Sequence, residues 1–117
     1  MRSTKYKIEV DIYTSKIFLV LSDNPKKTFN TYAKKKQDWV LEEDDDVGYF
    51  IRDNSGVYYM FIKPDPTLEE FTHEIQHATF DILRDHGVVL SGESEEAFTY
   101  LNDYLVKKLK QKVQIKL

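Results

Sequence analysis

The chain has 117 residues, of which 41% are hydrophobic and 14% aromatic, and this composition predicts one folded domain instead of a disordered chain. A formal net charge of −3 argues against a nucleic-acid partner. The absence of cysteine excludes disulfides and cysteine-ligated zinc sites, and it fits a reducing compartment, so we expect a cytoplasmic location.

The N-terminal segment predicts a β-hairpin. Residues 1–5 are mostly polar and no apolar run in the chain is long enough to span a membrane, so we expect neither a signal peptide nor a membrane partner. Residues 6–12 alternate between apolar and polar side chains, which is typical of a strand with one buried face. Residues 13–16 predict the connection, and the continuous apolar run 17–21 predicts a more central strand.

The next segment predicts a helix, a short strand and a loop. Asn24 as N-cap and Pro25 at the first helical position begin a helix that runs to about residue 36. Residues 39–41 are a candidate short strand. The acidic run 42–46 lacks the glycine and the distal glutamate of a calcium-binding EF-hand loop, so we interpret it as a solvated loop.

A second hairpin is predicted in the middle of the chain. Its strands cover residues 47–52 and 57–62, and the connection 53–56 has the sequence Asp-Asn-Ser-Gly, which favours a tight turn. Pro64 and Pro66 cannot continue a strand ladder, so they end the second strand.

The C-terminal half predicts two helices. Thr67 is an N-cap with Glu70 three residues on, which is a capping box, and the helix should end near residue 86 with Gly87 in the left-handed conformation. The last helix is expected over residues 94–110. The end of this helix and the residues after it are basic, which is favourable near the negative end of the helix dipole; a dedicated anion-binding patch is the alternative interpretation. The basic residues are Lys107, Lys108, Lys110, Lys112 and Lys116.

These elements predict the order ββ-α-ββ-α-α and an α+β fold. No internal repeat or linker divides the chain, so we expect a single domain over residues 1–117. A mixed or antiparallel sheet should pack on the helix that begins after Thr67.

That helix contains His73-Glu74-Ile75-Gln76-His77, the HExxH pattern. Residues four apart lie on one face of a helix, so both imidazoles can reach one ion, and Glu74 can reach a water bound to it. This is the chemistry of zinc-dependent peptide hydrolysis, in which zinc activates the water and the glutamate accepts its proton. The alternative is a pair of structural histidines that face solvent or bond to the backbone.

A catalytic zinc ion needs three protein ligands and one open position. Without cysteine, the third ligand must be a carboxylate or a histidine. Glu93, Glu95 and Glu96 lie in the first turn of the last helix, where a third ligand must be if the two helices pack together. Acidic residues in a first turn are also favoured by the helix dipole. Helical phase alone does not decide between Glu95 and Glu96.

The stretch 73–100 resembles the thermolysin-type gluzincins. In that group HExxH is followed about twenty residues later by a glutamate on a second helix, commonly before alanine. Here Glu96-Ala97 lies nineteen residues after His77 (96 − 77 = 19). The chain is also similar to small phage- and prophage-encoded metallopeptidases, in which a β-rich half precedes HExxH and a Glu-x-x-x-Tyr-Leu segment. The resemblance covers about a quarter of the chain by motif.

The resemblance implies a zincin-like minimal domain, with a phage-infected host cell as one setting. It implies His73, His77 and Glu96 as zinc ligands and Glu74 as the general base. Glu95 stays the alternative third ligand that helical phase leaves open.

One departure concerns the residues around the ligands. In thermolysin-like enzymes an aspartate four residues after the ligand glutamate orients a zinc-bound histidine, but this chain has Tyr100 there. A metal-bound histidine usually donates its other N–H to a carboxylate or a carbonyl. Asp103, Asn102 and a backbone carbonyl are the candidates for that acceptor.

Two residues are candidates for the hydrogen-bond donor that would stabilise the oxyanion formed during peptide hydrolysis. His86 is a candidate, with a surface histidine at a helix C-terminus as the alternative. Tyr100 is the other candidate, with a core tyrosine as its alternative. Tyr58 and Tyr59 precede the active helix, and one of the two is expected to be a packing residue.

By resemblance, the strand 57–62 is a candidate edge strand that pairs with an extended substrate, and an interior strand is the alternative. The leading hypothesis is therefore a zinc metallopeptidase that acts on a peptide or a protein. No segment corresponds to the second subdomain that forms the far cleft wall in active gluzincins, so we expect an oligomer or a partner protein to complete the cleft. The alternatives are a zinc-binding interaction module with little or no proteolytic activity and a metal-free helical interaction protein.

Overall fold

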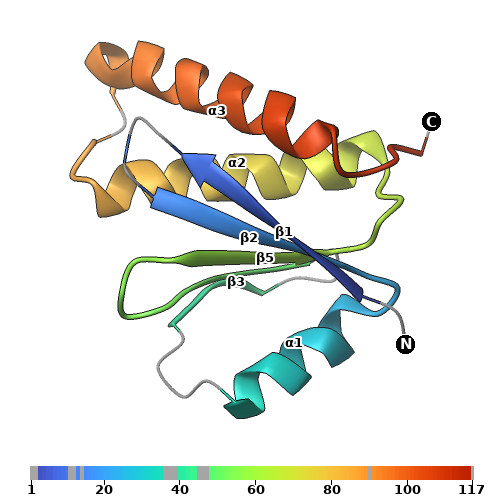
Figure 1. Cartoon of the computed structure of the whole chain (residues 1–117). Coiled ribbons are helices and arrows are strands. Elements are labelled where there is room, and N and C mark those ends of the chain that lie inside the picture. The colour runs from blue at the N-terminus through green and yellow to red at the C-terminus, as the bar shows by residue number, and fades with distance from the viewer. Residues whose placement is uncertain are drawn as a thin grey trace.

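The structure is a computed structural model that describes residues 3–10, 13, 15–35, 40–44, 48–89 and 91–116. A five-stranded mixed sheet carries one helix on one face and two helices on the other (Figure 1). The expected α+β class is confirmed, with one strand more than the predicted order. The elements are β1 (Ser3–Val10), β2 (Ser15–Ser22), α1 (Pro25–Lys35), β3 (Val40–Asp44), β4 (Tyr49–Arg52), β5 (Tyr58–Ile62), α2 (Leu68–Asp85), the short 3-10 helix η2 (Gly92–Ser94) and α3 (Glu95–Lys110).

The strands follow the order β1-β2-β5-β4-β3 across the sheet. β2 and β5 are parallel, from the pair Ile17–Tyr58 to the pair Leu21–Ile62, and every other neighbouring pair is antiparallel. β5 is therefore the central strand, and the expectation that it is a substrate-pairing edge strand is wrong. The uninterrupted apolar sequence of β5 already carried the signal, because a strand buried on both faces has no polar alternation.

The side chains of β5 alternate between two cores. Tyr58, Met60 and Ile62 belong to the core beneath α2 and α3. Tyr59 and Phe61 belong to the core on the opposite face, where the Phe29 and Tyr32 rings of α1 pack against Phe61. Tyr58 and Tyr59 are thus both packing residues. The sequence predicted this role for one of the two.

The first hairpin agrees with its prediction except at the connection. Ile8 and Val10 are buried on the face that α2 and α3 cover, as the alternation predicted. β2 lies between β1 and β5, as its continuous apolar run predicted. Ser15 and Lys16 belong to β2 instead of the turn, because they pair with Val10 and Glu9. Part of the predicted turn lies outside the described residues, as does Ile12.

The acidic segment is partly a strand and not a loop. Val40–Asp44 forms β3, which pairs with β4 through a bulge between Leu41 and Glu43. Backbone pairing with β4 at the sheet edge overrides the strand-averse acidic sequence. Trp39, the remainder of the predicted loop (residues 45 and 46) and Val47, the first residue of the predicted strand 47–52, lie outside the described residues.

Both ends of α2 form as the sequence predicts. The Thr67 side chain accepts from the Glu70 N–H, and the Glu70 side chain accepts from the Thr67 N–H, so the capping box is complete. At the other end Gly87 has φ +78°. Its N–H donates to the Arg84 carbonyl and the Val88 N–H donates to the Leu83 carbonyl, which is a Schellman motif.

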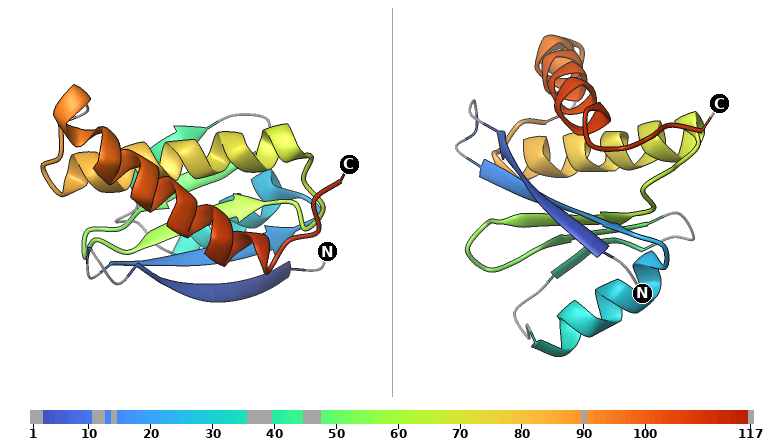
Figure 2. Two further views of the ribbon diagram at one scale, coloured as in Figure 1. Left: turned by 90° about the horizontal axis from the view of Figure 1, so that it is seen from above. Right: turned by 45° about the vertical axis from the view of Figure 1, so that its right-hand side comes forward.

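The two C-terminal helices are antiparallel neighbours, with α3 crossing α2 obliquely (Figure 2). Leu101, Leu105 and Leu109 are the buried face of α3. After α3 the chain returns beside the start of α2, where the Gln114 and Lys116 N–H groups donate to proline carbonyls at 2.8 Å each. No described helix is long and apolar enough to cross a membrane.

We predict that Thr67→Ala lowers the free energy of unfolding by about 1 kcal/mol, because it removes the side-chain acceptor for one N–H of the first turn. Urea unfolding measures the change. Thr67→Ser keeps the acceptor and should retain most of the stability. Equal stability of Thr67→Ala and the unmodified chain would contradict the role of this cap.

Candidate metal centre

The HExxH residues divide between two sides of α2. The buried side of this helix packs on the sheet and includes Phe71, Ile75, Ala78 and Ile82. His73 is exposed and His77 is half-buried, so both histidines lie away from that core. Their spacing of four residues places them one turn apart on the same side of the helix.

The two imidazoles converge. The distance between His73 Nε2 and His77 Nε2 is 3.0 Å, and the ring centroids are 4.5 Å apart. Two nitrogen atoms that each lie about 2.0–2.1 Å from a tetrahedral zinc ion are roughly 3.3 Å apart. The histidine pair therefore fits two adjacent ligand positions of one zinc ion with a small adjustment of the side chains.

Glu74 follows His73 in the helix and is 0% exposed, whereas His73 is exposed. Both carboxylate oxygens are shielded from solvent. A carboxylate at full burial is unusual, because charged groups lose hydration when they leave water. This burial places the only acid of the HExxH motif in the interface between α2 and the sheet, where the environment can hold it in one orientation.

Gly48 provides the space for Glu74. A Cβ atom at residue 48 would lie 3.3 Å from Glu74 Cδ, 2.6 Å from the Phe61 carbonyl oxygen and 2.9 Å from Ile62 Cγ2. A glycine at this point allows the backbone before β4 to approach the carboxyl group and the end of β5 closely. No local sequence pattern indicates this role of Gly48, because the contact links residues that are far apart in the chain.

The predicted third ligand does not join the histidine pair. Glu95 and Glu96 are exposed in the first turn of α3. Among the described residues, no group of three or more histidine and acidic side chains is placed to hold a metal ion. The contacts between the helices explain this separation: Phe98 meets Phe80 at 4.8 Å between ring centroids, so the start of α3 lies beside the C-terminal half of α2.

The candidate acceptors for the other N–H of a metal-bound histidine are Asp103, Asn102 and a backbone carbonyl. Asn102 Oδ1 accepts from the Thr79 hydroxyl at 3.2 Å, and Asp103 is exposed beside the lysines of α3. A further carboxylate, Asp81, is 8% exposed and follows His77 by four residues. It pairs with Arg84 at 3.1 Å. In the sequence, the spacing of four residues between His77 and Asp81 indicated that both lie on the same side of the helix.

The two candidate oxyanion donors lie on different elements, and His86 is far from the histidine pair. His86 follows His77 by nine residues, about 13 Å along the helix axis. Its Nδ1 is 2.7 Å from the Ile82 carbonyl oxygen and its ring contacts Tyr13. Tyr100 is 59% exposed on α3.

Asp85 anchors the end of α2 to the sheet. The Tyr58 hydroxyl donates to Asp85 Oδ2 at 2.7 Å, and Arg52 Nε lies 3.3 Å from the same oxygen. These contacts connect β4 and β5 to the last turn of the helix. They fix the rotation of α2 about its axis, and therefore the direction in which its histidines point.

Comparisons of the chain with protein-family models, with curated proteins and with solved structures found no match.

We predict that Gly48→Ala lowers the free energy of unfolding by about 1–3 kcal/mol, because the added methyl group overpacks the contact with β5 and Glu74. Thermal or urea unfolding measures the loss. Gly92→Ala is the matched control, since a Cβ atom there has open space and should change stability little. Similar stabilities of the two variants would show that Gly48 is not tightly enclosed.

Proposed function

We propose that this chain is a zinc metallopeptidase of the gluzincin type, built on a zincin-like minimal domain. The observation that carries the proposal is the approach of His73 Nε2 and His77 Nε2 to 3.0 Å on one helix that also buries Glu74. Imidazole nitrogen is a preferred zinc donor, and HExxH on a helix is the recurrent arrangement in zinc peptidases.

His73 and His77 would hold the zinc ion. Bound zinc would supply Lewis acidity and lower the pKa of a water molecule toward neutrality. Glu74 is the residue that would accept the proton from the attacking water and pass it to the leaving amine. Its enclosure by Gly48 and the end of β5 supports this role, because an enclosed carboxylate keeps one orientation during proton transfer.

Glu96 remains the proposed third ligand, with Glu95 as the alternative. The resemblance to gluzincins supports Glu96 through its spacing from His77. In the structure both glutamates are exposed at the start of α3, so either one would join the histidines only after a displacement of the first turn of α3. Metal binding would then be coupled to the position of α3 on α2.

The resemblance assigned substrate pairing to β5, which is the central strand of the sheet. In this proposal β3 pairs with the substrate instead. β3 is the edge strand next to β4, and the residue just before β4, Gly48, lies against Glu74. An extended peptide can add to such an edge through main-chain hydrogen bonds. A second copy of the chain or a partner protein would supply the opposite wall of the cleft.

The alternative function is a zinc-binding interaction module with little or no proteolytic activity. The observation that favours it is the distance of Glu95 and Glu96 from the histidine pair. A site that lacks the third ligand binds zinc more weakly and does not have the three protein ligands of a catalytic zinc site.

The first test concerns the metal. We predict that the purified chain binds about one zinc ion and that His73→Ala or His77→Ala abolishes this binding. Elemental analysis after dialysis measures stoichiometry, and competition with a chelator measures affinity. His86→Ala is the matched control, because His86 lies at the far end of the same helix and should leave zinc content unchanged. Zinc retained by the His77 variant would rule out the proposed site.

The same measurement assigns the third ligand. Glu96→Ala should weaken zinc binding by about tenfold or more, and Glu95→Ala should not. Loss with Glu95→Ala alone would move the assignment to Glu95, and no loss with either variant would favour the interaction module.

The second test concerns catalysis. We predict that the zinc-loaded chain cleaves members of a peptide library and that Glu74→Gln lowers the rate about 10²- to 10⁴-fold while zinc content is unchanged. Mass spectrometry of the products measures cleavage. Glu69→Gln, an exposed first-turn glutamate of the same helix, is the control and should keep full activity. Zinc binding without cleavage of any peptide would favour the interaction module.

A further inference from the structure

The outer edge of β1 is open. β1 is the first strand in the order β1-β2-β5-β4-β3, and β2 is its neighbour in the sheet. Within the described part of the chain, no backbone hydrogen bond joins the other edge of β1 to a further segment. An edge of this kind presents N–H and C=O groups with which an extended chain can pair. β1 can therefore accept one more strand.

A side chain of α3 indicates which backbone groups of β1 face outward. The Tyr104 hydroxyl donates to the Glu9 carbonyl oxygen at 2.6 Å. In an antiparallel strand the N–H and C=O groups of one residue point to the same side, and alternate residues share that side. The backbone groups of Lys5 and Lys7 therefore face outward with those of Glu9. These two residues offer two N–H donors and two C=O acceptors to a neighbouring chain.

The end of α3 forms a groove along this edge. One hollow, of about 400 Å³, lies between β1 and the last turns of α3, from Glu9 to Lys112 (Figure 2). A second hollow, of about 360 Å³, shares Lys112 with the first and continues along β1 to Tyr6 and Thr4. Each hollow is within the range of about 300–1,000 Å³ that is typical of ligand sites. We call the two hollows together the β1 groove.

The β1 groove has an excess of positive charge at its Glu9 end. Three lysines and one glutamate line the first hollow, and Lys7 pairs with Glu9 at 3.1 Å. Among the described residues, no carboxylate forms an ion pair with Lys108 or Lys112. Asp23 lines the second hollow, at the other end of the groove. Two exposed ammonium groups therefore remain beside the open strand edge, and they suit carboxylates of a bound segment.

The spacing of the two lysines matches that of alternate residues in a strand. Lys108 and Lys112 are four residues apart, which is a rise of about 6 Å along α3, and alternate residues of a strand are about 6.6 Å apart on one face. The end of α3 runs beside β1, because Tyr104 contacts Glu9 and Lys112 Nζ lies 4.9 Å from the centroid of the Tyr6 ring. Lys108 Nζ likewise lies 5.7 Å from the Tyr104 ring centroid. A strand added to β1 could therefore bring two acidic side chains to both ammonium groups.

We infer that the β1 groove binds an extended acidic segment of a partner protein, with glutamate or aspartate at alternate positions, by strand addition to β1. β1 and β3 are opposite edges of the sheet, so this site is separate from the proposed substrate edge, and the inference does not rest on the peptidase function. A protein partner is favoured over nucleic acid because main-chain pairing with β1 needs a peptide backbone. The positive charge is also local: residues 104–117 contain five lysines and no acidic residue, whereas the whole chain has a net charge of −3.

Peptide binding tests this inference. The acidic probe is a fluorescein-labelled nine-residue peptide in which threonine and glutamate alternate. One matched probe has lysine in place of each glutamate, and a second keeps the glutamates but has proline in place of the central threonines, which removes N–H groups and opposes strand pairing. Fluorescence anisotropy at low salt, with the full chain carrying Glu74→Gln to prevent cleavage, measures the affinities. We expect the acidic probe to bind about tenfold or more tightly than either matched probe.

A double variant of the groove locates the binding site. Lys108→Gln with Lys112→Gln should weaken binding of the acidic probe about tenfold, because it removes both ion pairs. Both side chains are exposed, so the fold should be kept, and urea unfolding checks this. Lys26→Gln with Lys27→Gln is the matched control: it makes the same change of charge at exposed residues of α1, on the other face of the sheet, and should leave the affinity unchanged.

Three results would overturn the inference. Equal binding of the acidic and proline probes would exclude strand addition. An equal loss of affinity in the two double variants, or no loss in either, would exclude the β1 groove as the site. Binding of an oligothymidylate of the same net charge as tightly as the acidic probe would show a general anion patch, whereas weaker binding of the oligothymidylate supports a peptide site. Because none of these measurements needs cleavage, failure of the peptidase proposal leaves this inference standing.

Discussion

The packing of α2 on the central strands is the interaction on which the rest of this structure depends. Phe71, Ile75, Ala78 and Ile82 bury one side of the helix against the core that β5 supplies. Burying large apolar side chains of this kind contributes about 1.5–3 kcal/mol each, less for alanine. Because this apolar side sets the rotation of the helix, it also determines that His73 and His77 point outward and that Glu74 points inward.

The inward position of Glu74 links stability to the proposed chemistry. A carboxylate at 0% exposure is costly to desolvate, and an apolar residue would fill the same place with less cost. Its position in the interface, with a glycine opposite to make room for it, supports its proposed role as the general base. Asp85 adds a second polar contact between helix and sheet through Tyr58 and Arg52, and the helix is held at both its middle and its end.

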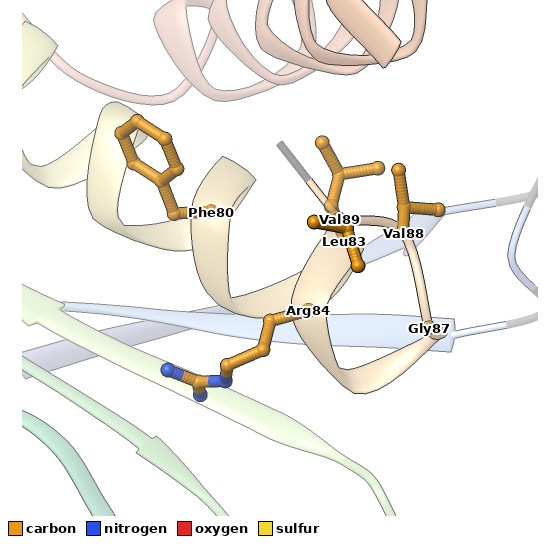
Figure 3. Close-up of a pocket in the computed structure, with 6 residues that line it drawn as sticks. All are labelled: Phe80, Leu83, Arg84, Gly87, Val88 and Val89. Carbon is orange, nitrogen blue, oxygen red and sulfur yellow. The ribbon is translucent and has the colours of Figure 1, made fainter. Parts of the chain in front are cut away.

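The two ends of α2 have different consequences for function. The capping box at Thr67 begins the helix six residues before His73, which places the HExxH motif within regular helix. The Schellman motif at Gly87 folds the chain back and forms the wall of an apolar pocket that includes Leu83 and Val88 (Figure 3). One helix therefore carries the candidate metal ligands, and its own termination signal determines where the helix ends beyond them.

Local patterns in the sequence determined the elements that a few neighbouring residues control. The capping box, the left-handed Gly87, the turn of the second hairpin and the shared side of His73 and His77 all depend on contacts within about four residues, so the sequence alone predicts them. Only the tertiary structure decided that β5 is central, that Gly48 lies against Glu74 and that Glu96 lies apart from the histidines. These features depend on pairing and packing between segments distant in the chain, where the free energy of the whole fold selects the neighbours and no local pattern specifies them.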